Sequence, residues 1–185
     1  MRIIAGKYKR RSLAALKADI RPTSDRLRGA VFDALGPMVH GAVFLDAMAG
    51  SGAMGLEALS RGASHVIFNE RDRRVRRLIE RNLSLCQVEE GYEIHSMDVF
   101  VMLREFQPRL APDILYFDPP YRFGRYSKLV ERLARSALLG PRAVAVIESL
   151  KRTDFDPSSS GLKQFNQLTA GDSAVRFLRR THPGD

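Results

Sequence analysis

The fold class follows from residues 43–62, which read Val43-Phe-Leu-Asp46-Ala-Met-Ala-Gly50-Ser-Gly52-Ala-Met-Gly55-Leu-Glu-Ala-Leu-Ser-Arg-Gly62. A short apolar run ends at Asp46, as in a buried strand, and a helical pattern over 53–61 follows, with Gly62 as a natural C-cap. Glycines at such a turn let the backbone approach a ligand closely and leave the N-terminus of the helix open as a donor site. Their spacing, Gly50-x-Gly52-x-x-Gly55, also satisfies the dinucleotide-binding fingerprint. The stretch therefore predicts a strand, a glycine-rich turn and a helix that together bind a ligand.

The same alternation of short apolar runs and helical patterns continues toward the C-terminus. Further strands are predicted at 65–68, 92–96, 113–117, 143–147, 162–168 and 174–178, the last two as an antiparallel pair. A helix is predicted from Asp72, with one face formed by Val75, Leu78, Ile79, Asn82 and Cys86. This pattern is typical of an α/β fold: a Rossmann-like, mostly parallel seven-stranded sheet with helices on both faces.

The first forty residues differ from the rest. Residues 1–13 alternate apolar and basic side chains around Gly6, which is consistent with a hairpin or a basic arm. The segment Arg21-Pro-Thr-Ser-Asp25 then leads into a helix that Thr23 or Asp25 could cap. Its apolar face is predicted to consist of Leu27, Ala30, Val31, Ala34, Leu35 and Met38. We expect a single domain over 1–185, with a small basic N-terminal extension over 1–40 on a core over 41–185.

The charge balance indicates a polyanionic partner. The chain carries 30 Lys and Arg against 21 Asp and Glu, a formal charge of +9, and nucleic acid is the usual partner of such a protein. A basic protein without such a partner would also fit the charge alone. The candidates for phosphate contacts are Arg2, Lys7, Lys9, Arg10, Arg11, Arg21, Arg26, Arg122, Arg125 and Lys128. The arginines between 71 and 81 are equally well explained as a solvated helix face.

Other residue types exclude several classes of site. Cys86 is the single cysteine, so no internal disulfide can form, and its apolar neighbours predict a small buried residue. The four histidines are scattered without metal-ligand spacing, and we expect no metal site. The apolar stretches are too short to span a membrane, and the basic start lacks the apolar core of a signal peptide. We expect a cytoplasmic protein with no membrane partner.

Acidic residues follow the first three predicted strands. Asp46 ends the first strand, Glu70 follows the second, and Asp98 follows the third. Glu70 lies twenty residues beyond Gly50, where a carboxylate can accept hydrogen bonds from ribose hydroxyls, and Asp98 could accept one from an adenine amino group. Asp98 also fits a helix N-cap, as Asp72 does, and the two roles are compatible. The predicted binding set for an adenosine-containing ligand is Asp46, Ala49, Gly50, Ser51, Gly52, Glu70, Arg71, Asp98 and Asp118.

The tetrapeptide Asp118-Pro119-Pro120-Tyr121 follows the strand predicted at 113–117 directly. Two prolines stop the strand and make the turn rigid, which holds the carbonyl of Pro119 and the side chain of Asp118 in place. Together they offer two acceptors to one exocyclic amine, while Tyr121 offers a flat face on which a base can stack. A proline-containing turn with an incidental Asp and Tyr is the structural alternative. We take the four residues as the candidate catalytic set.

These two motifs together resemble the class I methyltransferases that act on amino groups of nucleic-acid bases. More specifically, the chain is similar to the bacterial 16S rRNA guanine-N2 methyltransferases of the D type, and the similarity covers nearly all of the chain in the same order. It lies in Met1-Arg-Ile-Ile-Ala-Gly6, Arg21-Pro-Thr-Ser-Asp-Arg26, residues 45–62 and residues 118–121. The resemblance implies S-adenosylmethionine as cofactor and the amino group of one guanine, at the position customarily numbered 966, as the target. It also implies 16S rRNA as the partner, within an assembling small ribosomal subunit, and we expect a monomer.

Three positions depart from the pattern of that family. Lys9-Arg10-Arg11 stands where the family more often has Arg-Gly-Arg, Met48 replaces a usual Phe, and Gly29 replaces a usual Glu. The departures concern the RNA-binding arm more than the proposed chemistry.

Three other functions compete with this hypothesis. The glycine spacing alone would also suit a nicotinamide-dependent oxidoreductase, but that function leaves the tetrapeptide unexplained. An amino-methyltransferase acting on another RNA, or on adenine or cytosine in DNA, would keep the chemistry, although the chain is short for a separate target-recognition domain. A non-catalytic RNA-binding protein with a methyltransferase fold would be expected to carry a damaged motif, and the motif is intact.

Overall fold

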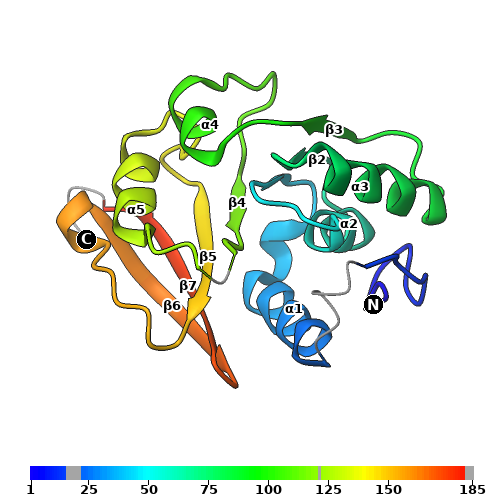
Figure 1. Cartoon of the computed structure of the whole chain (residues 1–185), viewed down its shortest axis with the longest axis horizontal. Helices are drawn as coiled ribbons and strands as arrows, with labels where there is room; N and C mark the ends of the chain where they lie inside the picture. Colours follow the sequence, from blue (N-terminus) through cyan, green and yellow to red (C-terminus); the bar gives the residue numbers. More distant parts are fainter. Residues whose placement is uncertain (16–21, 121, 182–185) are drawn as a thin grey trace.

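The computed structural model describes residues 1–15, 22–120 and 122–181, without the side chains of residues 22–24. A seven-stranded sheet runs through it in the order β3-β2-β1-β4-β5-β7-β6 (Figure 1). The strands are β1 (Val43–Asp46), β2 (His65–Asn69), β3 (Tyr92–His95), β4 (Ile114–Phe117), β5 (Val144–Leu150), β6 (Leu162–Ala170) and β7 (Ser173–Arg180). Strands β1 to β5 are parallel, whereas β7 pairs antiparallel with both β5 and β6.

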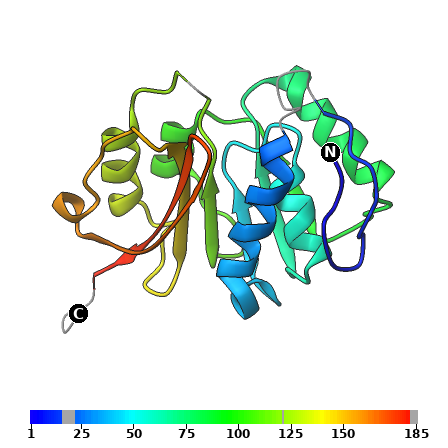
Figure 2. The same ribbon diagram turned by 90° about the horizontal axis from the view of Figure 1, so that it is seen from below.

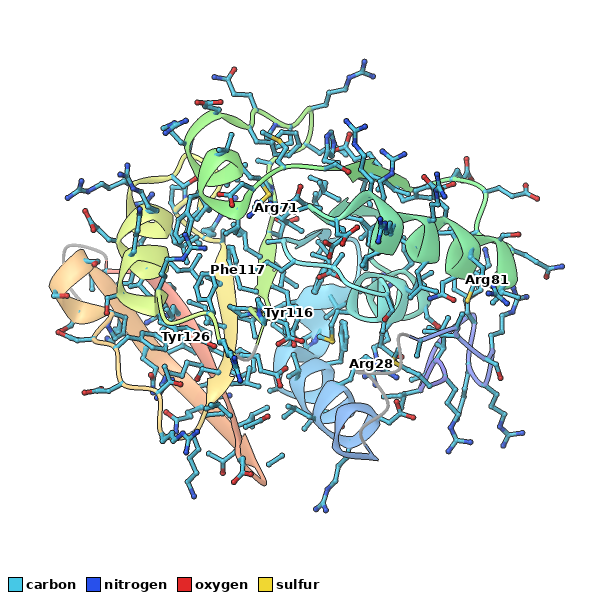
Figure 3. The ribbon with its side chains drawn as sticks, viewed as in Figure 1. Arg28, Arg71, Arg81, Tyr116, Phe117 and Tyr126 are labelled. Atoms are coloured by element: carbon cyan, nitrogen blue, oxygen red, sulfur yellow. The ribbon has the colours of Figure 1, made fainter. Side chains whose placement is uncertain are left out.

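Helices cover both faces of the sheet. They are α1 (Pro22–Leu35), η2 (Gly36–Val39), α2 (Ala53–Ser60), α3 (Arg73–Leu85), α4 (Val99–Glu105), α5 (Tyr126–Arg135) and η3 (Ser158–Ser160). One core cluster joins Phe44 and Tyr116 to α1, α2 and α3, and the other joins Leu45 and Phe117 to α4 and α5. The alternation of side chains along β1 and β4 thus sends successive residues into different cores. Figure 3 shows the same division, with Tyr116 toward α1 and Phe117 toward α5.

The predicted fold class is confirmed, and each predicted strand is present with its ends shifted by a few residues at most. The largest shift is in β5, which continues to Leu150 because its second half pairs with β7. Cys86 is fully buried, as predicted, and burial raises the pKa of its thiol while the Arg11 charge opposes that shift.

Two predictions about the first helix are wrong. The helix begins at Pro22, so Thr23 and Asp25 lie inside its first turn and do not precede it as caps. Asp25 instead pairs with Arg28 one turn later, at 2.9 Å. The predicted apolar face also differs at two positions. Met38 is 44% exposed because the chain leaves the α-helix at Leu35 and continues as the 3₁₀ turn η2, which changes the direction of later side chains. Ala34 is exposed as well, whereas Phe32 is buried. Arg21 lies outside the described residues.

The N-terminal residues form a hairpin, one of the two predicted possibilities. The backbone N–H of Ile3 donates to the carbonyl of Arg11 at 3.0 Å, and that of Leu13 donates to Met1 at 3.0 Å. The side chains of Ile3, Tyr8 and Leu13 are buried in the core cluster that includes α1 and α2. In Figure 2 this hairpin and the strands β6 and β7 lie on opposite sides of the molecule, with α1 between them.

A buried carboxylate holds the hairpin on α2. Glu57 has no exposed surface, and its two oxygens accept the backbone N–H groups of Ile4 (2.8 Å) and Ala5 (3.1 Å). Arg61 donates to the same carboxylate at 2.8 Å, and Arg28 lies 3.7 Å away. A buried charge is tolerated where it is paired and hydrogen-bonded in this way.

The hairpin also touches the end of α2 through its backbone. The N–H of Lys7 donates to the carbonyl of Ser60 at 2.7 Å, and the N–H of Tyr8 donates to the Ser60 hydroxyl at 2.9 Å. Gly6 has a φ of +81°, and a Cβ at this position would lie 1.7 Å from the Ser60 carbonyl oxygen. Glycine is therefore required at this contact.

Arg10 has a φ of +71°, a left-handed conformation that glycine adopts more easily. It occupies the middle of Lys9-Arg10-Arg11, where the resembling family more often has glycine. The departure at this position therefore has a structural cost, and Arg10 is held in a strained turn.

We predict that Arg10→Gly stabilises the protein by about 0.5–1 kcal/mol. Left-handed backbone costs an L-residue about 1–2 kcal/mol, and the greater freedom of glycine in the unfolded chain offsets about 0.5–1 of it. For a chain of this size, ~1 kcal/mol raises Tm by about 2–4 °C in thermal unfolding. Lys9→Gly is the control, because Lys9 does not have a positive φ and should lose stability instead. A lower Tm for Arg10→Gly would contradict the assignment of strain.

Candidate active site

The glycine-rich turn joins β1 to α2 at the carboxyl edge of the sheet. Gly50 and Gly52 have φ values of +53° and +77°, and Gly52 is the N-cap of α2 without a side-chain cap. A Cβ at Gly55 would meet the Phe68 ring at 2.2 Å, so α2 packs directly on β2. A Cβ at Gly50 would meet nothing within 4 Å. The turn thus combines left-handed backbone at two glycines, close packing of helix on strand, and open space beside Gly50.

Asp46 supports this turn from a buried position. The side chain is 1% exposed, and its Oδ2 accepts the backbone N–H of Gly55 at 3.0 Å. Burial raises the pKa of Asp46 to about 7, and the nearby charge of Glu70 adds to the rise, whereas the hydrogen bond from Gly55 opposes it. Its visible contact is with the first turn of α2, and a direct contact with a ligand stays a prediction.

Glu70 links the turn to the start of α3. Its Oε2 accepts the backbone N–H of Gly50 at 2.9 Å, and its Oε1 accepts that of Asp72 at 2.8 Å. The spacing of twenty residues therefore does bring Glu70 to Gly50. An ionised carboxylate has about four acceptor sites, so these two bonds leave capacity for hydroxyl donors of a ligand.

Arg71 lies in the loop between β2 and α3, and Asp98 lies at the end of the loop between β3 and α4. Asp98 is the N-cap of α4, where its Oδ1 accepts the N–H of Phe100 at 2.9 Å. Its Oδ2 lies 3.3 Å from the guanidinium of Arg71, whose side chain is 76% exposed. Asp72 caps α3 by accepting the N–H of Arg74 at 2.7 Å. Both predicted caps are confirmed, and the adenine contact of Asp98 stays a prediction.

Asn69, which the sequence did not single out, joins the end of β2 to two neighbouring loops. It is 2% exposed, and its amide nitrogen donates to the carbonyls of Ala47 (3.0 Å) and Met97 (3.1 Å). Its oxygen accepts the N–H of Met97 at 2.9 Å. The sequence signal was a polar residue between the apolar run 65–68 and Glu70. Asn69 thereby positions the loops that follow β1 and β3.

The tetrapeptide leaves the sheet beside the glycine-rich turn. Asp46 of β1 is the register partner of Tyr116 of β4, and Asp118 comes two residues later. Asp118 is exposed and Pro119 is buried, while the carbonyl of Pro120 accepts the N–H of Phe123 at 2.8 Å and closes the turn. Tyr121 lies outside the described residues.

Two tyrosines near Asp118 stay protonated. Burial raises the pKa of Tyr126 to about 12, with the charges of Asp118 and Glu148 adding to the rise. Burial also raises the pKa of Tyr116 well above its usual value, and its hydroxyl donates to Glu148 at 2.8 Å. At neutral pH neither phenol contributes a negative charge to this part of the site.

A row of aromatic rings lies behind the tetrapeptide. Phe100 stacks on Phe123 at 6.0 Å, Phe123 meets Tyr126 edge-on at 5.3 Å, and Tyr126 stacks on Phe155 at 5.6 Å. Arg125 lies over Phe100 at 4.8 Å. A small hollow next to this row is lined by Arg122, Gly124, Tyr126, Ser127, Thr153 and Asp154.

The predicted phosphate-binding residues are placed on several surfaces. Arg2, Lys9 and Arg10 are exposed on the hairpin, and Arg26 is exposed on α1. Lys7 and Arg11 both lie over the Tyr8 ring, at 5.3 and 5.2 Å, and the Arg11 guanidinium also donates to the carbonyl of Cys86. Arg11 therefore helps to dock the hairpin on α3.

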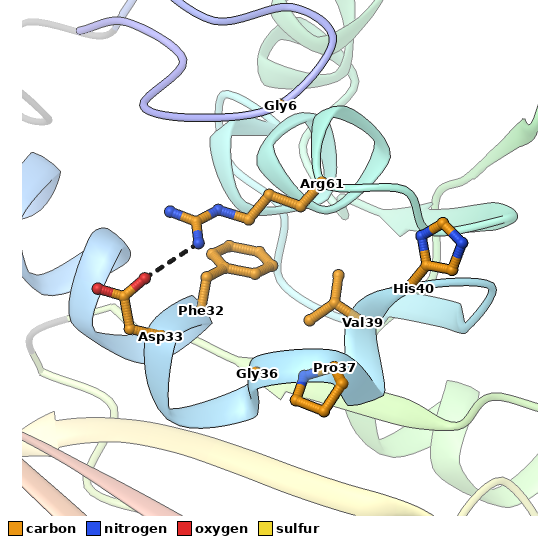
Figure 4. A pocket seen from close by; sticks show the side chains of 8 residues that line it. All are labelled: Gly6, Phe32, Asp33, Gly36, Pro37, Val39, His40 and Arg61. Carbon is orange, nitrogen blue, oxygen red and sulfur yellow. Dashed lines mark hydrogen bonds and ion pairs between the residues drawn. The ribbon is translucent and has the colours of Figure 1, made fainter.

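A second hollow, larger than the one beside the aromatic rings, lies away from these motifs. It is lined by Gly6, Phe32, Asp33, Gly36, Pro37, Val39, His40 and Arg61, and an ion pair of 3.1 Å joins Arg61 to Asp33 within it (Figure 4). Its lining includes the residues just before β1, so it belongs to the amino edge of the sheet. The glycine-rich turn and the tetrapeptide lie at the carboxyl edge, where ligands of open α/β sheets bind.

Within residues 1–15, 22–120 and 122–181, no three His, Cys, Asp or Glu side chains gather as a possible metal site. Over the same residues, each helix is too short or too polar to cross a membrane.

Known proteins resemble this chain over most or all of its length. A Haemophilus influenzae protein named ribosomal RNA small subunit methyltransferase D is 35% identical over 155 residues, which cover 82% of this chain and 79% of that protein. The Escherichia coli K12 protein of the same name is 30% identical over 186 residues, which cover 100% of this chain and 92% of that protein. The solved structure of the Escherichia coli protein yhhF has a TM-score of 0.84 at 30% identity and covers 97% of both chains. The resemblance to D-type rRNA methyltransferases is confirmed.

One protein family, described as conserved hypothetical protein 95, matches residues 1–179. The matched range contains the hairpin, the glycine-rich turn and the tetrapeptide. This chain therefore belongs to the conserved hypothetical protein 95 family.

Proposed function

We propose that this protein transfers a methyl group from S-adenosylmethionine to the exocyclic N2 of a guanine in 16S rRNA, at the 966-type position. The observation that carries the proposal is the meeting of two turns at one edge of the sheet. The glycine-rich turn follows β1 and the Asp118-Pro-Pro turn follows β4, its parallel neighbour. The names of the relatives, ribosomal RNA small subunit methyltransferase D, support rRNA methylation. We further propose that the protein acts as a monomer without a metal, on rRNA within an assembling small subunit.

The residues around the glycine-rich turn fit an adenosine-containing cofactor. The space beside Gly50 is open to close approach, and the carboxylate of Glu70 stands next to it with acceptor capacity for ribose hydroxyls. Asp98 would accept from the adenine amino group, and Arg71 lies beside it. When bound, S-adenosylmethionine supplies an electrophilic methyl group.

Asp118 and the carbonyl of Pro119 would hold the target amine. The guanine amine is a poor nucleophile because its lone pair is drawn into the ring. Two acceptors of hydrogen bonds from its two N–H groups would hold the nitrogen with its lone pair toward the methyl carbon. The N–C bond would form as the methyl–sulfur bond breaks to leave S-adenosylhomocysteine, and Asp118 would take the surplus proton. Positioning of this kind can lower the activation barrier by roughly 7–11 kcal/mol, so no metal or covalent intermediate is needed.

The electrostatics of the site favour Asp118 for this role. The phenols of Tyr116 and Tyr126 are neutral at neutral pH, as ordinary phenols are, and the raised pKa of each keeps them neutral at higher pH as well. The Glu148 carboxylate is engaged by the Tyr116 hydroxyl at 2.8 Å. Asp118 is exposed at the start of the turn and so can meet a base that enters from solvent.

The target base has to leave its stack to reach the turn, which costs a few kcal/mol. Stacking on Tyr121 would offset part of this cost, by about 1–3 kcal/mol. The exposed cations Arg2, Lys9 and Arg10 on the hairpin would contact phosphates, together with Arg122 near the tetrapeptide. Such contacts supply affinity and salt dependence but no sequence information.

We predict that Asp118→Ala lowers methyl transfer at least tenfold while cofactor binding is mostly kept. The change removes hydrogen bonds to a charged acceptor, each worth ~1.5–3 kcal/mol. Asp118→Asn should retain more activity than Asp118→Ala, because the amide keeps one acceptor oxygen. The measurement is transfer of labelled methyl from S-adenosylmethionine to under-methylated small subunits, naked rRNA and DNA, followed by nucleoside analysis. Labelled N2-methylguanosine from rRNA supports the proposal, whereas near-normal turnover of Asp118→Ala would remove Asp118 from the mechanism.

We predict that Glu70→Ala weakens the binding of S-adenosylhomocysteine in calorimetry. The variant loses the ribose acceptor and also the bond from Gly50 that holds the turn. Glu80→Ala is a matched control, since Glu80 is a half-exposed residue of α3 that pairs with Arg76 at 3.3 Å. Equal affinities for the wild type and Glu70→Ala would show that Glu70 is misassigned.

The basic hairpin is better tested by charge removal than by truncation, because Ile3, Tyr8 and Leu13 belong to the core. We predict that Lys9→Ser and Arg10→Gly each weaken RNA binding. Each change should also reduce the slope of log affinity against log salt by about 0.7–0.9, the value for one phosphate contact. Arg142→Ser is the control, because Arg142 is exposed just before β5, at the amino edge of the sheet. An unchanged slope for both hairpin variants would exclude them from phosphate contact.

A further inference from the structure

Asn82 of α3 joins the N-terminal hairpin to the glycine-rich turn through a buried side-chain amide. Its oxygen accepts the backbone N–H of Ala14 at 2.8 Å, and its nitrogen donates to the carbonyl of Ala14 at 2.9 Å. The same nitrogen donates to the carbonyl of Ser51 at 2.9 Å. Asn82 has no exposed surface. One side chain thus contacts the segment that follows the hairpin and the middle of the proposed cofactor turn.

From this geometry we propose that Asn82 is a positioning residue that couples cofactor binding to RNA binding. The proposal rests on the proposed function, in which the turn binds the cofactor and the hairpin binds RNA. It adds that the two sites strengthen each other, with the Asn82 amide as a direct connection between them, in addition to their shared contact with α2.

The amide is not needed for packing. Its neighbours on the inner face of α3, Ile79 and Leu83, are buried apolar residues, and an apolar side chain of similar size would fill the same position. A buried amide is costly unless its hydrogen bonds are made. Here both N–H groups and the oxygen are used, and every partner is a backbone group. The amide therefore fixes the backbone of two segments, at Ala14 after the hairpin and at Ser51 in the glycine-rich turn.

Among the described residues, the other side-chain hydrogen bonds that hold the hairpin come from residues outside the turn, including one from Arg28 of α1 to the carbonyl of Arg2. Glu57 and Ser60 lie in the second half of α2 and bind residues 4–8. Arg11 reaches the carbonyl of Cys86, at the end of α3. Asn82 contacts Ser51, which stands between the two left-handed glycines Gly50 and Gly52. The hairpin and the turn are therefore connected at Asn82 separately from the docking of the hairpin on α2.

The coupling follows because each ligand limits the motion of the backbone that it contacts. A cofactor bound against Gly50 and Gly52 limits the motion of Ser51, and through Asn82 that of Ala14. RNA bound on the hairpin limits Ala14, and through the same amide Ser51. Each ligand then finds part of the ordering already done by the other, and by linkage the effect is equal in both directions.

The test compares RNA affinity with and without saturating S-adenosylhomocysteine. For the wild type we expect RNA to bind at least about 5-fold more tightly with S-adenosylhomocysteine present, the lower end of typical coupling factors. In Asn82→Leu the ratio should fall to near 1, with each separate affinity still measurable. Ser60→Ala is the matched control: it loses the bond from the Tyr8 N–H but touches no residue of the turn. It should weaken RNA binding and keep the wild-type ratio.

A wild-type ratio near 1, or an equal loss of the ratio in Asn82→Leu and Ser60→Ala, would overturn the proposal. In the second case the effect would come from general loosening of the hairpin. A failure of S-adenosylhomocysteine or of RNA to bind the wild type would instead refute the proposed function, and the coupling with it.

A measurement on the wild type keeps the test valid if Asn82→Leu does not fold. Amide hydrogen exchange is followed by NMR with and without S-adenosylhomocysteine, in the absence of RNA. The Ala14 N–H, which donates to Asn82, should exchange more slowly when S-adenosylhomocysteine is bound, whereas the Tyr8 N–H, which donates to Ser60, should not change. Binding of S-adenosylhomocysteine without any change at Ala14 would overturn the coupling and leave the proposed function standing.

Discussion

The close packing of α2 against the sheet is the constraint on which the rest of the structure depends. Gly55 brings the helix so close to Phe68 that a single methyl group there would lie 2.2 Å from the ring. Asp46 fixes the same point by accepting the Gly55 N–H from the end of β1. The first turn of α2 is held in this way, and the residues before it cross the sheet edge in a tight turn in which Gly50 and Gly52 have φ values of +53° and +77°.

The other end of α2 determines where the hairpin lies. Glu57 and Ser60 are buried polar residues in a short, otherwise apolar helix, and both are satisfied by backbone groups of residues 4–8. One helix therefore positions the proposed cofactor turn at its start and the proposed RNA-binding hairpin at its end. Because a buried polar group without a partner costs about 1–3 kcal/mol, these bonds favour one arrangement of the hairpin over its alternatives.

Three buried side chains, Glu57, Asn69 and Asn82, share this kind of role. Each one bonds to backbone groups of segments that are distant in the sequence. Asn69 and Asn82 lie outside the motifs, whereas Glu57 lies within residues 45–62 but outside the glycine-rich turn. Asn69 holds the loops around the cofactor turn in position, while Glu57 and Asn82 hold the hairpin and the residue after it. The motif residues carry the proposed chemistry, and these three residues hold the motifs at the required places.

The parts of the fold that depend on local pattern were predictable. The strands at the centre of the sheet are short apolar runs between turns, and the caps Asp72 and Asp98 act within their own helices. The error at Met38 has a local cause that the apolar pattern concealed: Gly36, with a φ of +54°, and Pro37 end the α-helix before Met38. The strain at Arg10 was not visible in the sequence, because φ depends on how the hairpin closes.

The sequence by itself determined the fold class, the two motifs and the family, because each depends on residue types at short, fixed spacings. Only the tertiary structure decided which side chains those motifs meet. Glu70 reaches Gly50, Asp118 stands beside the turn of β1, and Asn82 bridges Ala14 and Ser51. These contacts join residues separated by twenty to seventy positions, and their geometry is set by the packing of α2 and α3 on the sheet. No local pattern in the chain contains that information, since it arises only when the core closes.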